Sequence, residues 1–117
     1  MEMKDSVIAD IRVLPLMNDT ASVSGIIAAV INVLKQAPDI SYQITPMATI
    51  VEGPLHRILE LMQEMHEIPF SLGVDRVVTC INIDDRRDKR ITMESKVRAV
   101  EEKLHLPSEP QLAEVAG

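Results

Sequence analysis

Hydroxyl, carboxylate and thioether side chains are the groups of this sequence that could contact a small ligand. Threonines interrupt two apolar segments at Thr49 and Thr79, and Glu52 follows three residues after the first. Hydroxyls inside an apolar pocket can orient a small polar molecule, although a buried threonine commonly bonds a nearby backbone group instead. Met47 would give such a pocket an adaptable apolar wall, whereas methionines on helices more often fill a core.

A second group of hydroxyls lies at Ser22 and Ser24, at the start of a segment with helical spacing. The free N–H groups of a helix N-terminus can hold an anion or a ligand oxygen. Serine is also a common N-cap, so capping alone accounts for Ser22 as an alternative.

Another polar segment, residues 84–88, is charged throughout. It is interpreted as a solvated turn with weak local ion pairs, with an inter-subunit salt-bridge cluster as the alternative.

The sequence shows no arrangement typical of catalysis or of metal binding. Its histidines, at positions 56, 66 and 105, are too far apart to form a ligand set, and neither a Ser/His/Asp pattern nor a glycine-rich phosphate loop is found. Cys80 falls in the middle of an apolar segment, where burial would make it unreactive. We therefore expect no enzyme, no metal site and no cofactor.

Composition narrows the class of protein and its partners. The protein has 117 residues, which suits one domain, and its 46% hydrophobic and 26% charged residues are ordinary for a globular protein and argue against a membrane protein. A net charge of -6 and only two aromatic residues, Tyr42 and Phe70, make nucleic acid an unfavourable partner. The first six residues lack the apolar run of a signal peptide, so we expect a cytoplasmic protein.

Hydrophobic periodicity predicts the elements that position these residues. Alternation indicates strands, and apolar residues three and four apart indicate helices. The expected strands cover 6–16, 40–53 and 74–83, and the expected helices cover 22–37, 54–67 and 92–105. The break at residues 46–48 favours a hairpin of two strands within 40–53, with one long bulged strand as the alternative. We expect Pro69 to end the second helix and Met93, Val97, Val100 and Leu104 to form the buried stripe of the third. Residues 1–105 are predicted to form a single domain, and 106–117 a mobile tail.

The order β-α-β-β-α-β-α predicts an α+β, ferredoxin-like fold with antiparallel sheet order 4-1-3-2 and the first two helices on one face. In this fold the 18–24 loop and the Pro46-Met47 turn lie at one end of the sheet, and Glu52 and 84–88 at the other. The opposite sheet face is left uncovered by these two helices. Its mixture of apolar and polar residues predicts an interface between copies of the protein.

Four strings resemble the thiamine-binding-protein family of small cytosolic ferredoxin-like domains. They are IADIRVLPL (8–16), SVSG (22–25), TPMATIVEG (45–53) and RVVTCINIDDRRDK (76–89). The resemblance extends over residues 6–104. It implies dimers and tetramers assembled through the sheets, and binding of thiamine or a pyrimidine-related precursor without a known reaction. The sequence departs from the family at Met17, where Gly is typical, at Ala21, where Pro is frequent, and at Asn82, where Lys is common.

The implied ligand suggests roles for the polar residues. Thiamine carries a thiazolium cation, which suits the net charge of -6, and Glu52 or Asp10 could neutralise it or bond the pyrimidine amine. Tyr42, on the helix-facing side of its strand, could stack on a ring. The ligand-binding residues predicted in this way are Ser22, Ser24, Tyr42, Met47, Thr49, Glu52 and Thr79. We expect non-enzymatic binding by a carrier, buffer or sensor; the alternative is a structural or regulatory homo-oligomer that senses another metabolite at its interfaces.

Overall fold

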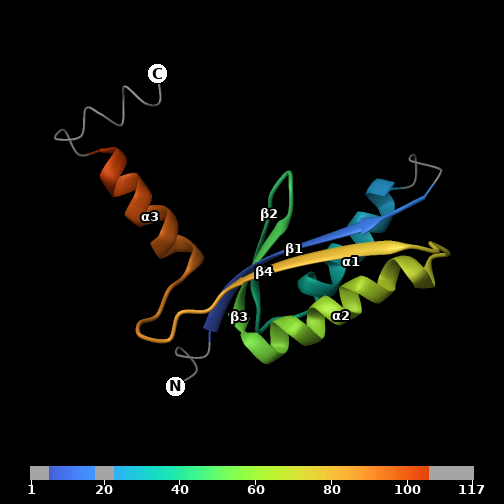
Figure 1. Ribbon diagram of the computed structural model, residues 1–117, viewed down its shortest axis with the longest axis horizontal. Coiled ribbons are helices and arrows are strands. Elements are labelled where there is room, and N and C mark those ends of the chain that lie inside the picture. The colour runs from blue at the N-terminus through green and yellow to red at the C-terminus, as the bar shows by residue number, and fades with distance from the viewer. Residues whose placement is uncertain (1–5, 18–22, 106–117) are drawn as a thin grey trace.

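A computed structural model describes residues 6–17 and 23–105 (Figure 1). The predicted tail, residues 106–117, lies outside the described residues, as do positions 18–22. The elements in sequence order are β1 (Ser6–Pro15), α1 (Val23–Lys35), β2 (Ser41–Ile44), β3 (Thr49–Pro54), α2 (Leu55–Ser71), β4 (Val77–Asp84) and α3 (Met93–Leu104).

The four strands form one antiparallel sheet in the order β2-β3-β1-β4. This confirms the predicted order and the predicted α+β class. Alternate residues of β1, from Val7 to Val13, are buried on the side of the sheet that α1 and α2 cover. The two helices contribute apolar residues spaced three and four apart, which places one stripe of each on the sheet. The buried residues of these stripes are Ile26, Val30 and Leu34 of α1 and Ile58, Leu61 and Met65 of α2.

The predicted hairpin of β2 and β3 is confirmed. Its turn is closed by the backbone hydrogen bond from Thr45 N–H to Ala48 C=O (2.9 Å) and reinforced by the Thr45 hydroxyl, which donates to the same carbonyl (2.6 Å) and accepts from Ala48 N–H (3.1 Å). At the other end of β3, the backbone of Gly53 packs against Ile40. A Cβ on Gly53 would lie 2.4 Å from Ile40 Cδ1, so a larger residue at position 53 would require the end of the Ile40 side chain to shift.

The prediction that Pro69 ends the second helix is wrong, because α2 continues to Ser71. A proline inside a helix lacks an N–H and clashes with the carbonyl four residues earlier, which usually breaks the helix. Here the proline lies in the last turn and its ring is fully buried. Its carbonyl accepts from the N–H groups of Leu72 and Val74, both at 3.0 Å, so the helix end is closed just beyond it.

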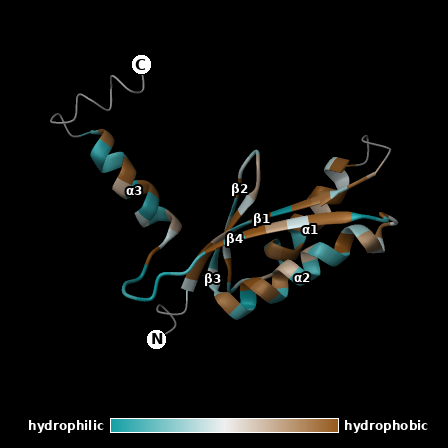
Figure 2. Cartoon of the chain, viewed as in Figure 1, coloured by the Kyte–Doolittle hydropathy of each residue, from teal (hydrophilic) through white to brown (hydrophobic). Residues whose placement is uncertain are grey.

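The prediction that α3 buries its apolar stripe is also wrong for the single subunit. No residue of α3 is buried; Val97, Val100 and Leu104 are 57%, 58% and 66% exposed. The helix follows a hydrophilic loop and extends away from the sheet (Figures 1 and 2). Apolar residues three and four apart show that one face of a helix is hydrophobic. They do not show whether the same subunit or another molecule covers that face.

The two ladders of β1 have different lengths. The ladder with β4 continues to the pair Pro15–Val77, whereas the ladder with β3 ends four residues earlier, at the pair Ile11–Thr49. Beyond that pair, the tip of the β2–β3 hairpin diverges from the C-terminal half of β1 (Figure 1). The sheet therefore opens between the end of β1 and the hairpin turn.

Candidate ligand-binding site

The opening between β1 and the hairpin turn is a cavity of about 390 Å³, which we call the hairpin pocket. Residues 11–15 of β1, residues 44–49 of the hairpin and one face of α1 surround it. Its size falls within the range of about 300–1,000 Å³ that is usual for small-molecule sites. The apolar residues that line it include Val13, Ile27, Ile31, Ile44, Met47 and Met65.

Two of the predicted ligand-binding residues, Met47 and Thr49, line this pocket. Met47 is 70% exposed at the hairpin turn, so its thioether is free to move against a ligand. The Thr49 side chain is almost fully buried, yet no described residue hydrogen-bonds its hydroxyl. No fully buried side-chain nitrogen or oxygen among the described residues lacks a partner, so the Thr49 hydroxyl is not completely buried, and Thr49 is one of the residues that line the pocket. It can donate to or accept from a ligand.

Thr79, in contrast, is already paired with a histidine that we did not predict as a partner. Its hydroxyl lies 2.7 Å from Nδ1 of His66, on α2. The His66 ring meets Phe70 edge-on, with the ring centroids 5.5 Å apart. Neither Thr79 nor His66 lines the hairpin pocket. This geometry supports the structural interpretation of Thr79, as a hydroxyl that holds a helix side chain against β4.

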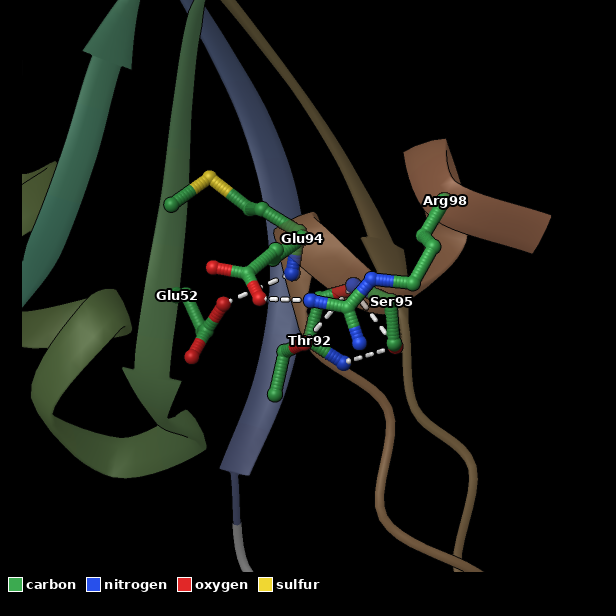
Figure 3. Close-up of polar contacts among 6 residues, drawn as sticks. Glu52, Thr92, Glu94, Ser95 and Arg98 are labelled. Carbon is green, nitrogen blue, oxygen red and sulfur yellow. Dashed lines mark hydrogen bonds and ion pairs between the residues drawn. The ribbon is translucent and has the colours of Figure 1, made fainter. Parts of the chain in front are cut away.

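Glu52 lies at the opposite end of the sheet, on the face that α1 and α2 leave uncovered. One of its carboxylate oxygens accepts from the N–H of Met93, the first residue of α3, at 2.7 Å (Figure 3). Thr92 and Ser95 add a reciprocal capping box, and Glu94 forms an ion pair with Arg98 one turn later (Figure 3). In the single subunit, Glu52 therefore holds the start of α3 and does not face the hairpin pocket.

The other predicted ligand-binding residues are not brought to the hairpin pocket. Tyr42 is half-buried on the helix-facing side of β2, opposite Val51, but does not line the cavity. Ser24 is exposed on the first turn of α1 and does not line it either. Ser22 lies outside the described residues. Because Phe70 lies near His66, neither of the two aromatic rings can stack on a ligand in this pocket.

The charge inside the hairpin pocket differs from the charge of the whole protein. Arg12 is the one charged residue among the described residues that line it, and its side chain lies on the sheet face opposite α1 and α2. Asp10, a predicted partner for a thiazolium cation, accepts from the Asn82 side chain at 2.9 Å on the uncovered face. The described lining thus offers no carboxylate to a cation, although the protein as a whole has a net charge of -6.

The charged run after β4 forms ion pairs within itself. Arg86 binds Asp88 and Arg87 binds Asp85, while Lys96 of α3 binds Asp84. The hydrogen bond from Arg87 lowers the pKa of Asp85, and the hydrogen bond from Arg86 lowers the pKa of Asp88. The Asp88 side chain is 69% exposed, as expected for a solvated turn, whereas the Asp85 side chain is only 22% exposed. The register places Glu52 and Asp84 on either side of Ile8, which confirms that these segments share one end of the sheet.

Cys80 is exposed on the uncovered sheet face, directly opposite Arg12, so the prediction that it is buried is wrong for the single subunit. Its strand is an edge strand whose outer face has no helix over it. In the described ranges, 6–17 and 23–105, no three His, Cys, Asp or Glu side chains come together as a possible metal site. No helix among these residues is long and apolar enough to cross a membrane.

Comparison with known proteins gives the family. The family model described as "Thiamine-binding protein" matches residues 9–101. The protein belongs to this family. It is 46% identical to the UPF0045 protein YqgV of Bacillus subtilis, over 83% of this sequence and 96% of the relative, and 36% identical to a UPF0045 protein of Methanothermobacter thermautotrophicus, over 82% and 97%.

Solved structures show the same fold. A hypothetical protein of Methanocaldococcus jannaschii aligns with a TM-score of 0.77 and 36% identity, over 84% of this protein and 98% of the other. A Thermotoga maritima protein, named for thiamine biosynthesis or salvage, aligns with a TM-score of 0.71 and 25% identity, over 81% and 98%.

Proposed function

We propose that this protein binds thiamine or a related pyrimidine without catalysing a reaction, and that the hairpin pocket is the site. The observation that carries the proposal is an apolar cavity of ligand size lined by Thr49, whose hydroxyl bonds no described residue, and by Thr45, whose hydroxyl is bonded to Ala48. Membership of the thiamine-binding protein family supports the choice of ligand. The strand order and connectivity support a ferredoxin-like fold, and a carrier, buffer or sensor is the role that fits binding without reaction.

The charge of the pocket favours the neutral pyrimidine over the thiazolium cation. A buried cation needs a nearby carboxylate, and the charged residue at this pocket is Arg12. Thiamine would therefore enter with its pyrimidine ring first and leave its thiazolium toward solvent. A free hydroxymethylpyrimidine would be accommodated without that constraint.

Calorimetric titration with thiamine and with hydroxymethylpyrimidine tests the proposal. We expect binding below millimolar concentration, and the Thr49→Val variant to bind about two- to thirteenfold more weakly, because a neutral hydrogen bond contributes about 0.5–1.5 kcal/mol. Thr79→Val is the matched control, since its hydroxyl contacts His66 outside the pocket. If neither compound binds, or if both variants lose the same affinity, the hairpin pocket is not the site.

A second function is supported by the surfaces that the single subunit leaves uncovered. We propose that copies of the protein associate into dimers or tetramers through the open face, defined by Ile8, Asp10, Arg12, Leu14, Ile50, Val78, Cys80 and Asn82, and the apolar stripe of α3. Such uncovered apolar surface is typical of interfaces. On this alternative, the protein is a structural or regulatory oligomer that senses another metabolite between subunits.

A panel of metabolites, each added to the protein in a thermal-unfolding assay, distinguishes the two functions. A compound that binds the folded state raises the Tm. If thiamine and hydroxymethylpyrimidine leave the Tm unchanged while another metabolite raises it, the alternative is favoured. If only the pyrimidine compounds raise it, the first proposal stands.

A further inference from the structure

The hairpin pocket contains backbone groups that the sheet itself does not use. In an antiparallel ladder, successive residues of a strand direct their N–H and C=O groups to opposite sides. The N–H of Leu16 donates to Arg76 C=O at 2.9 Å, on the β4 side, so the even-numbered residues of β1 face β4. The odd-numbered residues, Val13 among them, direct their N–H and C=O toward β3.

At Val13, β3 is no longer present. The ladder between β1 and β3 ends at the pair Ile11–Thr49, and Val13 is paired only with Thr79, on the other side. Within residues 6–17 and 23–105, no strand therefore bonds the N–H and C=O of Val13. Val13 is one of the residues that line the hairpin pocket, where Ile27 and Ile31 of α1 provide an apolar wall.

We propose that the N–H and C=O of Val13 bind the ligand by two hydrogen bonds, and that the ligand is a planar ring with an amino group beside a ring nitrogen. A neighbouring strand would offer Val13 one acceptor and one donor on the same side. An aminopyrimidine offers the same pair, because its ring nitrogen accepts and its exocyclic amine donates. The ring fills the position that the next residue pair of β3 would have occupied.

This recognition explains how the pocket can select a ring without aromatic residues. Tyr42 and Phe70 do not line it, so stacking on a side-chain ring is not available. Ile27, Ile31 and Met47 can contact the ring faces, but such apolar contacts distinguish poorly between rings of similar shape. A donor and acceptor pair on the backbone does distinguish them, since a ring without the amine leaves a backbone carbonyl unpaired.

The inference rests on the proposed function, and it is tested with three ligands and the wild-type protein. The ligands are hydroxymethyl aminopyrimidine, its analogue without the amino group, and its analogue without the hydroxymethyl arm. We expect loss of the amino group to weaken binding at least about tenfold, because it leaves a buried backbone acceptor unpaired. Loss of the hydroxymethyl arm leaves both Val13 bonds in place and should have a smaller effect.

Amide-resolved NMR locates the bonds during the same titrations. The Val13 amide proton should move downfield with both ligands that carry the amine, and further than those of Arg12 and Leu14, which already donate within the β4 ladder. In the free protein, Val13 should exchange faster than these two neighbours. Protection of the Val13 amide equal to theirs before any ligand is added would overturn the inference.

The possible failures are distinguishable. If neither thiamine nor hydroxymethyl aminopyrimidine binds, the proposed function and the inference both fail. If the compounds with and without the amine bind equally and the Val13 amide does not move, the inference alone is wrong, and the pocket recognises its ligand through side chains.

Discussion

At the scale of single residues, the candidate site combines a side chain, that of Thr49, with the backbone groups of Val13. Thr49 was predictable as a ligand-binding candidate because a hydroxyl stands out in an apolar segment. Val13 carries no such signal, since any residue other than proline at that position presents an N–H and a C=O. Its role depends on where β3 begins, at Thr49, because the ladder between β1 and β3 stops there. The sequence offered one signal for this role: the predicted first strand is longer than either strand of the hairpin, so part of its backbone must lack a partner on the hairpin side.

Arg12 allows a prediction about ligand charge. The Arg12→Gln variant removes the positive charge that lines the hairpin pocket. We expect its affinity for thiamine to rise about two- to fivefold, because repulsion of the thiazolium by a half-exposed charge is modest, and its affinity for neutral hydroxymethylpyrimidine to change little. Titrations of both ligands at low and high salt measure this. An equal change in affinity for both ligands would show that the charge of Arg12 does not determine the preference for the neutral pyrimidine over thiamine.

Gly53 allows a prediction about stability. Gly53→Ala places a Cβ 2.4 Å from Ile40 Cδ1 and should lower the free energy of unfolding by about 1–3 kcal/mol, the usual cost of overpacking. Gly25→Ala is the matched control, because it is exposed on α1 with nothing within 4 Å of the added methyl. That change should stabilise by about 0.5–1 kcal/mol, since alanine favours a helix. Urea unfolding compares them; equal stabilities would contradict the close packing at Gly53.

At the scale of elements, α3 is held by its cap and not by a core. Its first N–H bonds Glu52, and Thr92 and Ser95 cap the remaining turn, while none of its residues is buried. Thr92→Ala should therefore destabilise α3 by about 0.5–2 kcal/mol, the usual value of an N-cap, without destabilising the sheet. Thr92→Ser, which keeps the hydroxyl, is the control.

Hydrogen exchange resolved by residue measures this effect. We expect faster exchange in α3 of Thr92→Ala and unchanged exchange in the buried strands β1 and β3. Faster exchange throughout the domain would mean that α3 packs on the sheet more firmly than its exposure indicates.

The elements that the sequence predicted well are those whose partners lie within the same subunit. The alternating apolar residues of β1 and the apolar stripe of α1 are buried against each other within the subunit. Patterns of this kind were therefore sufficient to predict the sheet order and the hairpin. The exposure of α3 was not predictable, because its apolar stripe has no partner in the single subunit. The sequence predicted Met47 and Thr49 as ligand-binding residues, and both line the hairpin pocket. It also predicted Glu52, Thr79 and Tyr42, which lie elsewhere. Contacts such as that of Thr79 with His66 depend on the tertiary fold, so the sequence could not show which candidates share a site.

At the scale of the whole molecule, the open face and α3 leave apolar surface that one subunit does not cover. We expect self-association at micromolar concentration, and we expect the double variant Val97→Lys, Val100→Lys to be monomeric, because two charges on the exposed stripe would have to be buried in the interface. Ala99→Lys, on the same helix but outside the stripe, is the control. Analytical ultracentrifugation measures both; a monomeric wild-type protein would contradict the proposal of self-association.

The location of the ligand is the central claim, and a crystal structure with hydroxymethyl aminopyrimidine tests it most directly. We predict that the ring lies between the end of β1 and the 45–48 turn, with its amine and ring nitrogen on the C=O and N–H of Val13 and the Thr49 hydroxyl within hydrogen-bonding reach. A ring bound instead between α3 and the open face, beside Glu52, would contradict the account.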